Sequence, residues 1–327
     1  MLSIRFRLAA AGLLCLSGCS GAQSALDPAG RGAEVLADLF WWMAAGAVIV
    51  WTAVMALAFH AVRVDPGAGG RRSALLIIGG GAVIPTIVLT VLLIYGLRLM
   101  PPLLAAVPPG TMQIAVTGEQ WWWRVRYDPA GGEAVELANE IRLPVGETVE
   151  LLLDSRDVIH SFWIPALGGK MDMIPGRRTR LVLEPTRTGT FRGACAEYCG
   201  TSHALMAFPV VVMEREEFAR WLEAQRSAAP APSSAEARAG HDRFFASGCP
   251  ACHAVAGTSA RGVIGPDLTH VGSRLTLGAG ILPNEPGAFV RWIERAEGVK
   301  PGAHMPAFHM LGRGELHALA AYLESLQ

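Results

Sequence analysis

The sequence predicts a multi-domain chain in which a two-helix transmembrane hairpin precedes an all-β domain and then an all-α domain. Three observations support this prediction. Two long uncharged apolar runs lie between residues 39 and 97, short strand-like segments continue to about residue 213, and a proline-rich linker precedes a helical C-terminal part. At 327 residues the chain is long enough for several domains.

The composition agrees with membrane segments joined to soluble domains. Hydrophobic residues make up 51% of the chain and charged residues only 17%, which is a low charged share for a soluble protein. The formal net charge is zero. A nucleic-acid-binding protein usually carries an excess of basic residues, so we expect no nucleic-acid partner.

Residues 1–18 are predicted to be a lipoprotein-type signal peptide. Arg5 and Arg7 form a short positive region, and an apolar run of about ten residues follows, too short to span a bilayer. The run ends in LSGC at residues 16–19, which resembles the bacterial lipobox. We therefore expect cleavage before Cys19 and a lipid on its sulfur. The alternative is an ordinary signal peptide with a chance cysteine.

Residues 19–100 are predicted to be a membrane anchor with two helices, at about 39–62 and 73–97. Leu39 to Phe59 and Ser73 to Leu97 contain no charged residue. Each run is long enough for a helix that crosses the bilayer, which takes ~20 residues. Glycines and a proline interrupt the second run, which transmembrane helices tolerate. The alternative is a pair of buried core helices.

The charges between the two runs predict the orientation of the hairpin. The connecting loop carries Arg63, Arg71 and Arg72. By the positive-inside rule this loop is cytoplasmic, so both ends of the hairpin lie on the outer side. We expect a multi-pass protein of the bacterial inner membrane, with everything after residue 100 on the periplasmic side.

Residues 101–226 are predicted to be the all-β domain. The segments MQIAVTG, ETVELLLD, RTRLVLEP and FPVVVM have strand-like patterns and are separated by turn residues, which favours a sandwich or barrel. A short helix is expected at 214–226. The linker SAAPAPSSA covers 227–235, and the C-terminal domain, 236–327, ends in the helical pattern ELHALAAYLESL.

The motif CPACH, at residues 249–253, predicts a covalently bound haem. Two thiols spaced by two residues can each add to a haem vinyl group, so Cys249 and Cys252 would hold the haem and His253 would coordinate its iron. A disulfide or a redox-active CxxC pair is the alternative.

Residues 236–327 resemble a class I cytochrome c. The resemblance rests on CPACH, on GPDL at 265–268, and on HMP at 304–306. It implies an all-α fold with haem c and Met305 as the second axial iron ligand, which suits an electron carrier. His304 and Met310 are the competing ligands. The remaining histidines of the domain that we considered, His241, His270 and His309, are expected at the surface.

A second cluster of soft ligands lies in CAEYCGTSHALM, residues 195–206. It contains Cys195, Cys199, His203 and Met206, and His160 is the candidate for a further ligand from an earlier strand connection. Thiolate, imidazole and thioether together select copper. A mononuclear blue copper site needs only one cysteine, whereas two thiolates could bridge two coppers, with one histidine terminal on each. A disulfide is the remaining alternative.

Over residues ~30 to 215 the chain resembles cytochrome c oxidase subunit II, whose pattern CxExCGxxHxxM the stretch 195–206 matches at every specified position. The resemblance implies a cupredoxin-like domain holding the dinuclear CuA centre. It also implies that Glu197 binds copper through its backbone oxygen, while its side chain reaches a magnesium at the boundary with subunit I. The segment GGKMDMIPGR, 168–177, resembles the loop near that boundary.

The stretch QWWW, residues 120–123, resembles the aromatic segment on the family's electron route. The resemblance makes Trp121 the candidate electron relay. Tyrosine is more common as the second of the three aromatic residues, which is a modest departure. The alternative role of the three tryptophans is packing near the membrane surface.

The two resemblances together imply a caa-type haem–copper oxidase, whose subunit II carries its own cytochrome c. Electrons would pass from cytochrome c or another reduced donor through haem c to CuA and on to subunit I, where oxygen is reduced and protons are pumped. The chain would be a cytochrome-c oxidase subunit, in a translocase with subunits I and III as partners.

Three other classes of protein were weighed against this interpretation. Quinol oxidase subunit II lacks the copper cysteines, and nitrous oxide reductase lacks the membrane hairpin. A membrane-bound copper-storage or delivery protein would not need the covalent haem that CPACH predicts.

Overall fold

The computed structural model describes residues 20–63, 70–104, 106–128 and 134–327. The chain forms two compact units: one contains the residues up to Leu36 together with Pro109–Gln327, and the other contains Ala37–Pro108. The predicted signal peptide and the predicted lipid site at Cys19 lie outside the described residues.

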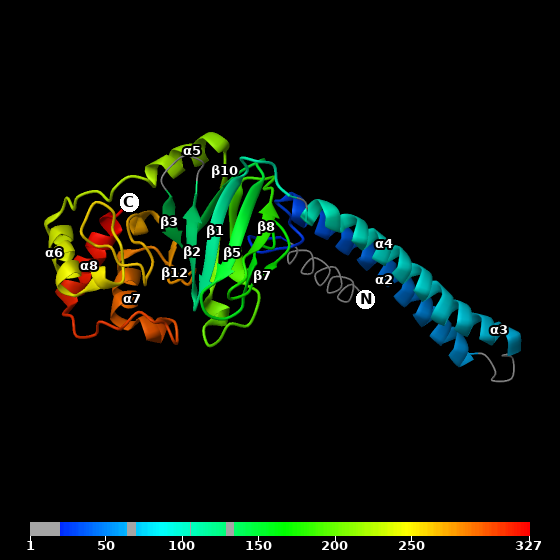
Figure 1. Ribbon diagram of the computed structural model, residues 1–327. Coiled ribbons are helices and arrows are strands. Elements are labelled where there is room, and N and C mark those ends of the chain that lie inside the picture. Colours follow the sequence, from blue (N-terminus) through cyan, green and yellow to red (C-terminus); the bar gives the residue numbers. More distant parts are fainter. Residues whose placement is uncertain (1–19, 64–69, 105, 129–133) are drawn as a thin grey trace, which may run out of the picture. The chain divides into compact units, whose positions relative to one another are not determined.

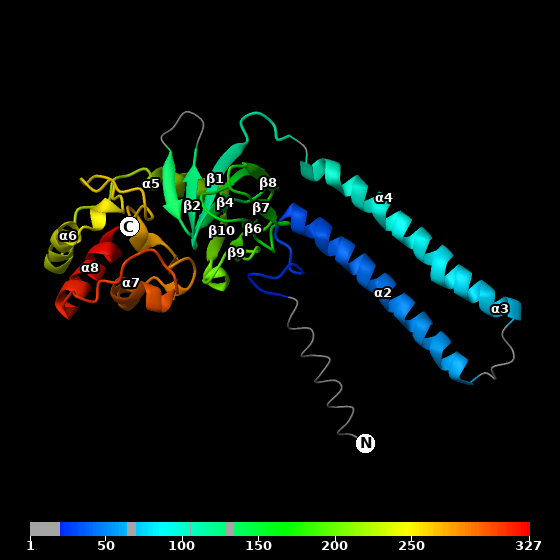
Figure 2. The ribbon, with the colours of Figure 1, turned by 60° about the horizontal axis from the view of Figure 1, so that its bottom comes forward.

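The second unit is a hairpin of long apolar helices (Figure 2). Within the described residues, two helices are long and apolar enough to cross a membrane, over Arg31–Arg63 and Ser73–Met100. They contain the predicted runs and extend beyond them. The elements are α2 (Arg31–Arg63), α3 (Gly70–Leu75), the π-helix η2 (Leu76–Val83) and α4 (Ile84–Leu104).

The second apolar helix contains a π-helical stretch just before its proline. Pro85 has no backbone N–H, so it cannot make the α-helical bond to the carbonyl of Gly81. The N–H of Ile84 instead bonds to the carbonyl of Gly79, five residues earlier. Backbone groups that lose their α-helical partners in this way are paired again, which hydrocarbon surroundings would require.

The all-β domain is a sandwich of two five-stranded sheets (Figure 1). Their strand orders are β3-β2-β1-β5-β8 and β4-β10-β9-β6-β7. The strands are β1 (Met112–Glu119), β2 (Trp122–Tyr127), β3 (Val135–Ala138), β4 (Ile141–Pro144), β5 (Val149–Ser155), β6 (His160–Trp163), β7 (Met171–Met173), β8 (Thr179–Leu183), β9 (Gly189–Cys195) and β10 (Ala207–Met213). The prediction of an all-β domain is confirmed.

Aromatic rings fill the space between the sheets. Trp123 packs edge-on against Phe162 and Phe208, with ring centroids 5.6 and 5.2 Å apart. Phe162 and Phe208 stack at 4.9 Å. A Cβ on Gly193 would lie 2.1 Å from the Phe208 ring, so only glycine lets this ring reach the core. These contacts fix β6, β9 and β10 relative to one another.

The segment before α2 packs against the sandwich. The N–H of Ala29 donates to the carbonyl of Ala166 at 2.7 Å, and the N–H of Arg31 donates to Glu184 at 3.0 Å. A Cβ on Gly30 would lie 2.5 Å from the carbonyl oxygen of Leu167, which explains the glycine. The start of the first apolar helix is therefore held by the β-domain.

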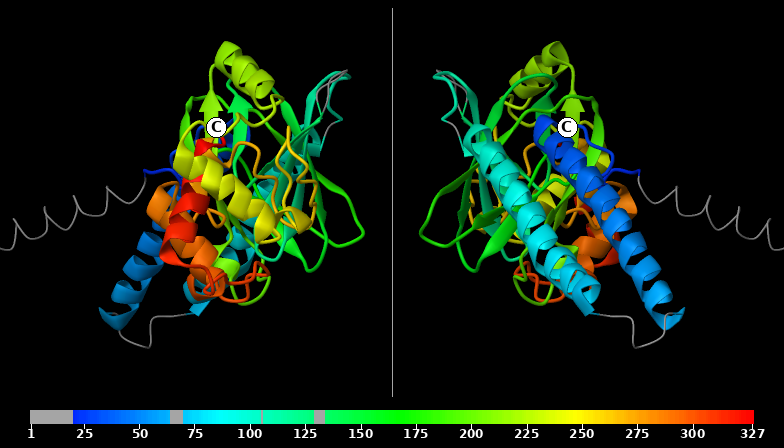
Figure 3. Two further views of the ribbon diagram at one scale, coloured as in Figure 1. Left: turned by 90° about the vertical axis from the view of Figure 1, so that its left-hand side faces the viewer. Right: turned by 90° about the vertical axis from the view of Figure 1, so that its right-hand side faces the viewer.

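The C-terminal domain is helical, as predicted. After α5 (Arg215–Ala224), it contains α6 (Ala235–Ala246), η4 (Cys249–Ala251), η5 (Val271–Ser273), the short strands β11 (Thr276–Leu277) and β12 (Leu282–Pro283), α7 (Pro286–Val299) and α8 (Arg313–Ser325). Its first and last helices, α6 and α8, pack against each other (Figures 1 and 3). A Cβ on Gly240 of α6 would lie 1.8 Å from the carbonyl oxygen of Ala318 in α8, so the two backbones nearly touch.

The expectation that His270 lies at the surface is wrong. Its side chain is only 5% exposed. Its Nε2 donates to the carbonyl oxygen of Ser227 at 3.1 Å, at the start of the linker. A contact across 43 residues leaves no local pattern in the sequence, so only the fold reveals it.

We expect Gly240→Ala to destabilise the C-terminal domain. Its added methyl would meet the α8 backbone, and overpacking of this kind costs roughly 1–3 kcal/mol or more of unfolding free energy. Native-state hydrogen exchange of peptides covering α6 and α8 measures this loss.

Gly314→Ala in α8 is the matched control. A Cβ there meets no atom within 4 Å, and alanine is the better helix former by about 0.5–1 kcal/mol, so this variant should keep or gain protection. Equal protection in the Gly240→Ala variant and the unsubstituted chain would contradict the prediction.

Candidate metal centres

The structure brings together the side chains that the sequence singled out around residues 160 and 195–206. Ligand atoms of His160, Cys195 and Cys199 all lie within 4.8 Å of one another, and all three residues are buried. The two sulfur atoms are 3.8 Å apart, far beyond the ~2.05 Å of a disulfide, and both cysteines are free. The pair is a dithiol.

Each sulfur atom also faces a histidine nitrogen. Cys195 Sγ lies 3.8 Å from His160 Nδ1, and Cys199 Sγ lies 3.6 Å from His203 Nδ1. One weaker donor lies beside each cysteine as well. The thioether sulfur of Met206 is 3.9 Å from Cys199 Sγ, and the carbonyl oxygen of Glu197 is 3.2 Å from Cys195 Sγ. The cluster thus offers two thiols, two imidazoles, one thioether and one carbonyl.

The chain reaches this arrangement through two strands and one loop. Cys195 ends β9 and His160 begins β6, and these neighbouring strands pair with Phe162 opposite Cys195. The other four residues lie in the loop before β10. A Cβ on Gly118 of β1 would lie 2.8 Å from the His160 ring, so glycine makes room for this imidazole.

Asp157 orients the imidazole of His160, and the sequence analysis missed it. Its Oδ1 lies 2.8 Å from His160 Nε2, which leaves Nδ1 directed at Cys195. Carboxylates that hold the far nitrogen of a ligating histidine are common around metal sites. Asp157 also accepts from the N–H groups of Gln120 at 2.6 Å and Val158 at 2.7 Å. A carboxylate three residues before His160 was the available signal.

The electrostatics of the cluster favour a Cys195 thiolate beside a protonated His160. The hydrogen bond from Cys199 lowers the pKa of the Cys195 thiol, and the contact with His160 lowers it further. Burial acts to lower the pKa of His160, but its bonds to Cys195 and Asp157 raise it overall. The hydrogen bond to Cys195 raises the pKa of the Cys199 thiol, so a metal would displace protons from Cys199 and His160 on binding.

Trp121 is hydrogen-bonded to the loop of residues 196–206, which carries Cys199. Its indole Nε1–H donates to the carbonyl oxygen of Cys199 at 3.0 Å, and the Gln120 side chain donates to the same oxygen at 2.7 Å. Trp121 is only 8% exposed. The indole of Trp121, the candidate relay, is therefore hydrogen-bonded to the backbone of Cys199, whose sulfur belongs to the cluster.

Glu197 turns its side chain away from the sulfur atoms. Its carboxylate is half-exposed and lies 3.8 Å from the Lys170 amine, which also pairs with Asp172 at 3.2 Å. The backbone and the side chain of Glu197 thus face different surroundings, as two separate ligand roles would require.

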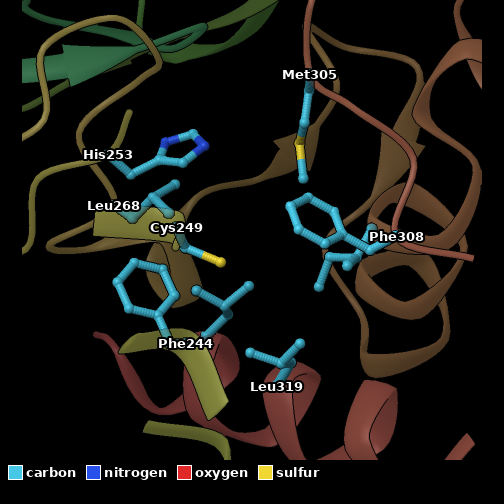
Figure 4. Close-up of a pocket in the computed structure, with 9 residues that line it drawn as sticks. Phe244, Cys249, His253, Leu268, Met305, Phe308 and Leu319 are labelled. Atoms are coloured by element: carbon cyan, nitrogen blue, oxygen red, sulfur yellow. The ribbon is translucent and has the colours of Figure 1, made fainter. Parts of the chain in front are cut away.

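The C-terminal domain contains an apolar cavity (Figure 4). His253 and Met305 enter it from opposite sides, and Cys249 also points into it. The lining residues are Phe244, Cys249, His253, Leu268, Ile293, Met305, Phe308, Leu319 and Leu323. An apolar slot between an imidazole and a thioether suits a flat hydrophobic group that carries iron.

The orientation of His253 fits an axial ligand. Its Nδ1–H donates to the carbonyl oxygen of Pro266 at 2.7 Å, which leaves Nε2 as the free nitrogen. A Cβ on Gly265 would lie 2.6 Å from this ring, so the loop can approach only as glycine. Burial lowers the pKa of His253, which favours the neutral form that coordinates metal.

The structure distinguishes the three candidates for the second axial position. Met305 lines the cavity, whereas the side chain of Met310 is 68% exposed. His304 lies beside Trp121, with ring centroids 6.4 Å apart, and does not line the cavity. The geometry therefore favours Met305. Cys252 lies at the end of η4 and is not among the lining residues.

Two known protein families match the part of the chain that follows the apolar helices. Residues 127–214 match the family "Cytochrome C oxidase subunit II, periplasmic domain", and residues 237–327 match the family "Cytochrome c". These matches cover the β-sandwich from the end of β2 and nearly all of the C-terminal domain.

Curated relatives carry the same description. The chain is 40% identical over 217 residues to cytochrome c oxidase subunit 2 of Alkalihalophilus pseudofirmus, covering 66% of this chain and 62% of the relative. It is 34% identical to the Bacillus sp. PS3 protein of that name, covering 66% and 63%, and 31% identical to that of Bacillus subtilis, covering 65% and 62%. The matched part thus spans a little over three fifths of each relative's length.

The β-sandwich carries a cluster of two thiols and two imidazoles. The helical domain that follows it carries a cavity lined by His253 and Met305. Each domain matches its own family over most of the domain's length. Residues 127–214 are thus similar to the periplasmic domain of cytochrome c oxidase subunit II and residues 237–327 to cytochrome c, an arrangement consistent with a fused caa-type subunit II.

Proposed function

We propose that this chain is the electron-input subunit of a respiratory haem–copper oxidase, that is, subunit II of a cytochrome-c oxidase with a fused cytochrome c. The observation that carries the proposal is the presence of two donor sets for one-electron cofactors in one chain. The family matches of both domains support it.

The donor set of the first cluster fits two copper ions. Thiolates of Cys195 and Cys199 would bridge the ions, and His160 and His203 would each bind one. The residues that remain, Met206 and the carbonyl of Glu197, would be weak ligands. Asp157 would hold His160 in the tautomer that directs Nδ1 to the metal.

The second site fits haem c. Cys249 and Cys252 would form thioether bonds to the vinyl groups, and His253 and Met305 would be the axial ligands. The Pro266 carbonyl would fix the tautomer of His253 and make it a stronger donor. When bound, haem c and CuA supply reversible one-electron transfer at the two sites.

The cellular role follows from these sites and from the apolar helices. Electrons would come from cytochrome c or another reduced donor, pass through haem c and CuA with Trp121 as relay, and leave for subunit I, where oxygen reduction is coupled to proton pumping. Two helices long and apolar enough to cross a membrane support a multi-pass subunit of the bacterial inner membrane, with both metal domains on the periplasmic side.

Several partners belong to the same proposal. Subunits I and III would complete the oxidase, and the carboxylate of Glu197 would bind a magnesium ion at the boundary with subunit I. A lipid on Cys19 would add a second membrane anchor. A copper-storage or delivery role is less well supported, because it leaves the His253–Met305 cavity without a use.

The first test is the electron paramagnetic resonance spectrum of the copper-loaded full chain. We expect the seven-line hyperfine pattern of one electron shared by two copper nuclei. Cys199→Ser should abolish this pattern, because an alcohol does not bridge copper as a thiolate does. Thr201→Ala changes an exposed side chain in the same loop and should keep it. A four-line pattern in the unsubstituted chain would reject the dinuclear assignment.

The second test concerns the axial methionine. Met305→Ala should leave the haem attached but lower its reduction potential by on the order of 0.1 V, within the ~0.8 V over which axial ligands set haem potentials. A spectroelectrochemical titration of the α-band measures the change. Met310→Ala removes an exposed thioether five residues away and should not change the potential. The opposite result would exchange the roles of the two methionines.

A further inference from the structure

Lys300 joins the C-terminal domain to the β-sandwich. It follows the last residue of α7 and is only 3% exposed. Its ammonium donates to the carbonyl oxygen of Trp121 at 2.5 Å and to that of Gly278 at 2.9 Å. Trp121 belongs to the sandwich and Gly278 to the C-terminal domain, so one amine connects main-chain groups of both.

The segment after Lys300 continues the contact towards the cavity. The hydroxyl of Ser202 donates to the carbonyl oxygen of Pro301 at 2.6 Å. Gly302 has a φ of +79°, and a Cβ there would lie 2.7 Å from the Trp121 ring. Met305 lies three residues further on. The loop that carries the cavity's thioether is thus seated on Trp121 itself.

A second set of bonds surrounds this contact. The N–H of Ala207, at the start of β10, donates to the carbonyl of Ala279 at 3.1 Å. The N–H of Leu275 donates to the buried carboxylate of Glu140 at 2.8 Å. These bonds connect β10, and the turn before β4, with the β11–β12 hairpin. The contact therefore has a defined position.

A buried lysine is costly unless its donors are satisfied. Burial lowers the pKa of Lys300 to about 7, and the Cys199 thiol, the only titratable group found to act on it in the described part of the chain, raises it. Its two acceptors, on Trp121 and Gly278, are main-chain carbonyls, so its role does not depend on an opposite charge. An apolar side chain would fill the same space without binding these oxygens. The hydrogen bonds of the amine fix the position of one domain relative to the other.

We propose that Lys300 is a positioning residue that locks the cytochrome c domain onto Trp121 of the sandwich. The docked arrangement is then the resting state of the chain. The 227–235 linker does not have to let a detached cytochrome c domain diffuse back to the sandwich. The docking itself follows from the contacts. Its consequence for electron transfer rests on the function proposed above.

The consequence is that transfer between the two sites needs no domain movement. With both cofactors bound, one electron would pass from ferrous haem, leaving it ferric, to the copper pair, which it would reduce. On the protein side, Gly302 already touches Trp121, and Trp121 already bonds to the Cys199 carbonyl, while Met305 lies three residues after Gly302. A tethered domain that had to find its site would be slowed by solvent viscosity, whereas a locked one would not.

The test compares Lys300→Met with Arg291→Met in the detergent-solubilised full chain. Both remove one positive charge from the C-terminal domain, but Arg291 is exposed on α7. A hydrogen bond from a charged group is worth about a tenfold or larger change in an equilibrium, so Lys300→Met should shift docking towards the open state by about that factor.

The first measurement is hydrogen exchange, which needs neither cofactor to be active. Peptides containing the amides of Ala207 and Leu275 should lose protection in Lys300→Met and keep it in Arg291→Met. The second is the haem-to-copper transfer rate after photoreduction, at several glycerol concentrations. It should be independent of viscosity in the unsubstituted chain and become viscosity-dependent only in Lys300→Met.

Haem and copper spectra separate the possible failures. If the unsubstituted chain lacks the CuA or haem signals, the proposed function fails, and exchange alone still tests the docking. Native spectra with unchanged exchange and viscosity-independent transfer in Lys300→Met would overturn the positioning role. If Lys300→Met does not fold, Ser202→Ala, which removes the bond to Pro301, should show a smaller loss of protection at Ala207 and Leu275. Unchanged protection in that variant would also overturn the proposal.

Discussion

The candidate copper site depends on one backbone hydrogen bond, from the N–H of Cys195 to the carbonyl of Met206 at 2.9 Å. This bond closes the ligand loop at its first and last donor residues, directly beyond the antiparallel pairing of β9 with β10. Because the strands are fixed by the Trp123–Phe162–Phe208 core, the loop has little freedom. The soft side chains are thus held at contact distance before any metal binds, which lowers the ordering cost of binding.

The fold class and the ligand types were accessible from sequence because they are local. Spacing within 195–206 and within 249–253 is short, and a strand or helix pattern needs only a few residues. The features that were missed depend on the geometry of the folded chain rather than on a recognised sequence pattern. The π-helical stretch before Pro85 depends on backbone geometry. The burial of His270 depends on Ser227, a partner far along the chain. Asp157 and Lys300 acquire their roles only when the chain folds.

The two families account for different parts of the mechanism. The sandwich provides Trp121, held by the Cys199 carbonyl, and the cytochrome c domain provides the loop of Met305, held by Lys300. Neither domain alone presents a complete connection between the two candidate sites. A polypeptide that joins them fixes their stoichiometry at one to one and keeps the partners together through every turnover.

Within the described residues, the contact between the two domains uses main-chain oxygens as acceptors at four positions: Trp121, Val263, Ala279 and Pro301. Main-chain oxygens are present whatever residue occupies a position. Side chains at most of these sites can therefore change during evolution without removing an acceptor, provided that the backbone keeps its path. Divergent descendants of this chain could keep the backbone path of the interface while sharing few of its residues. The residues under strongest selection would be the few side chains that donate hydrogen bonds to these oxygens.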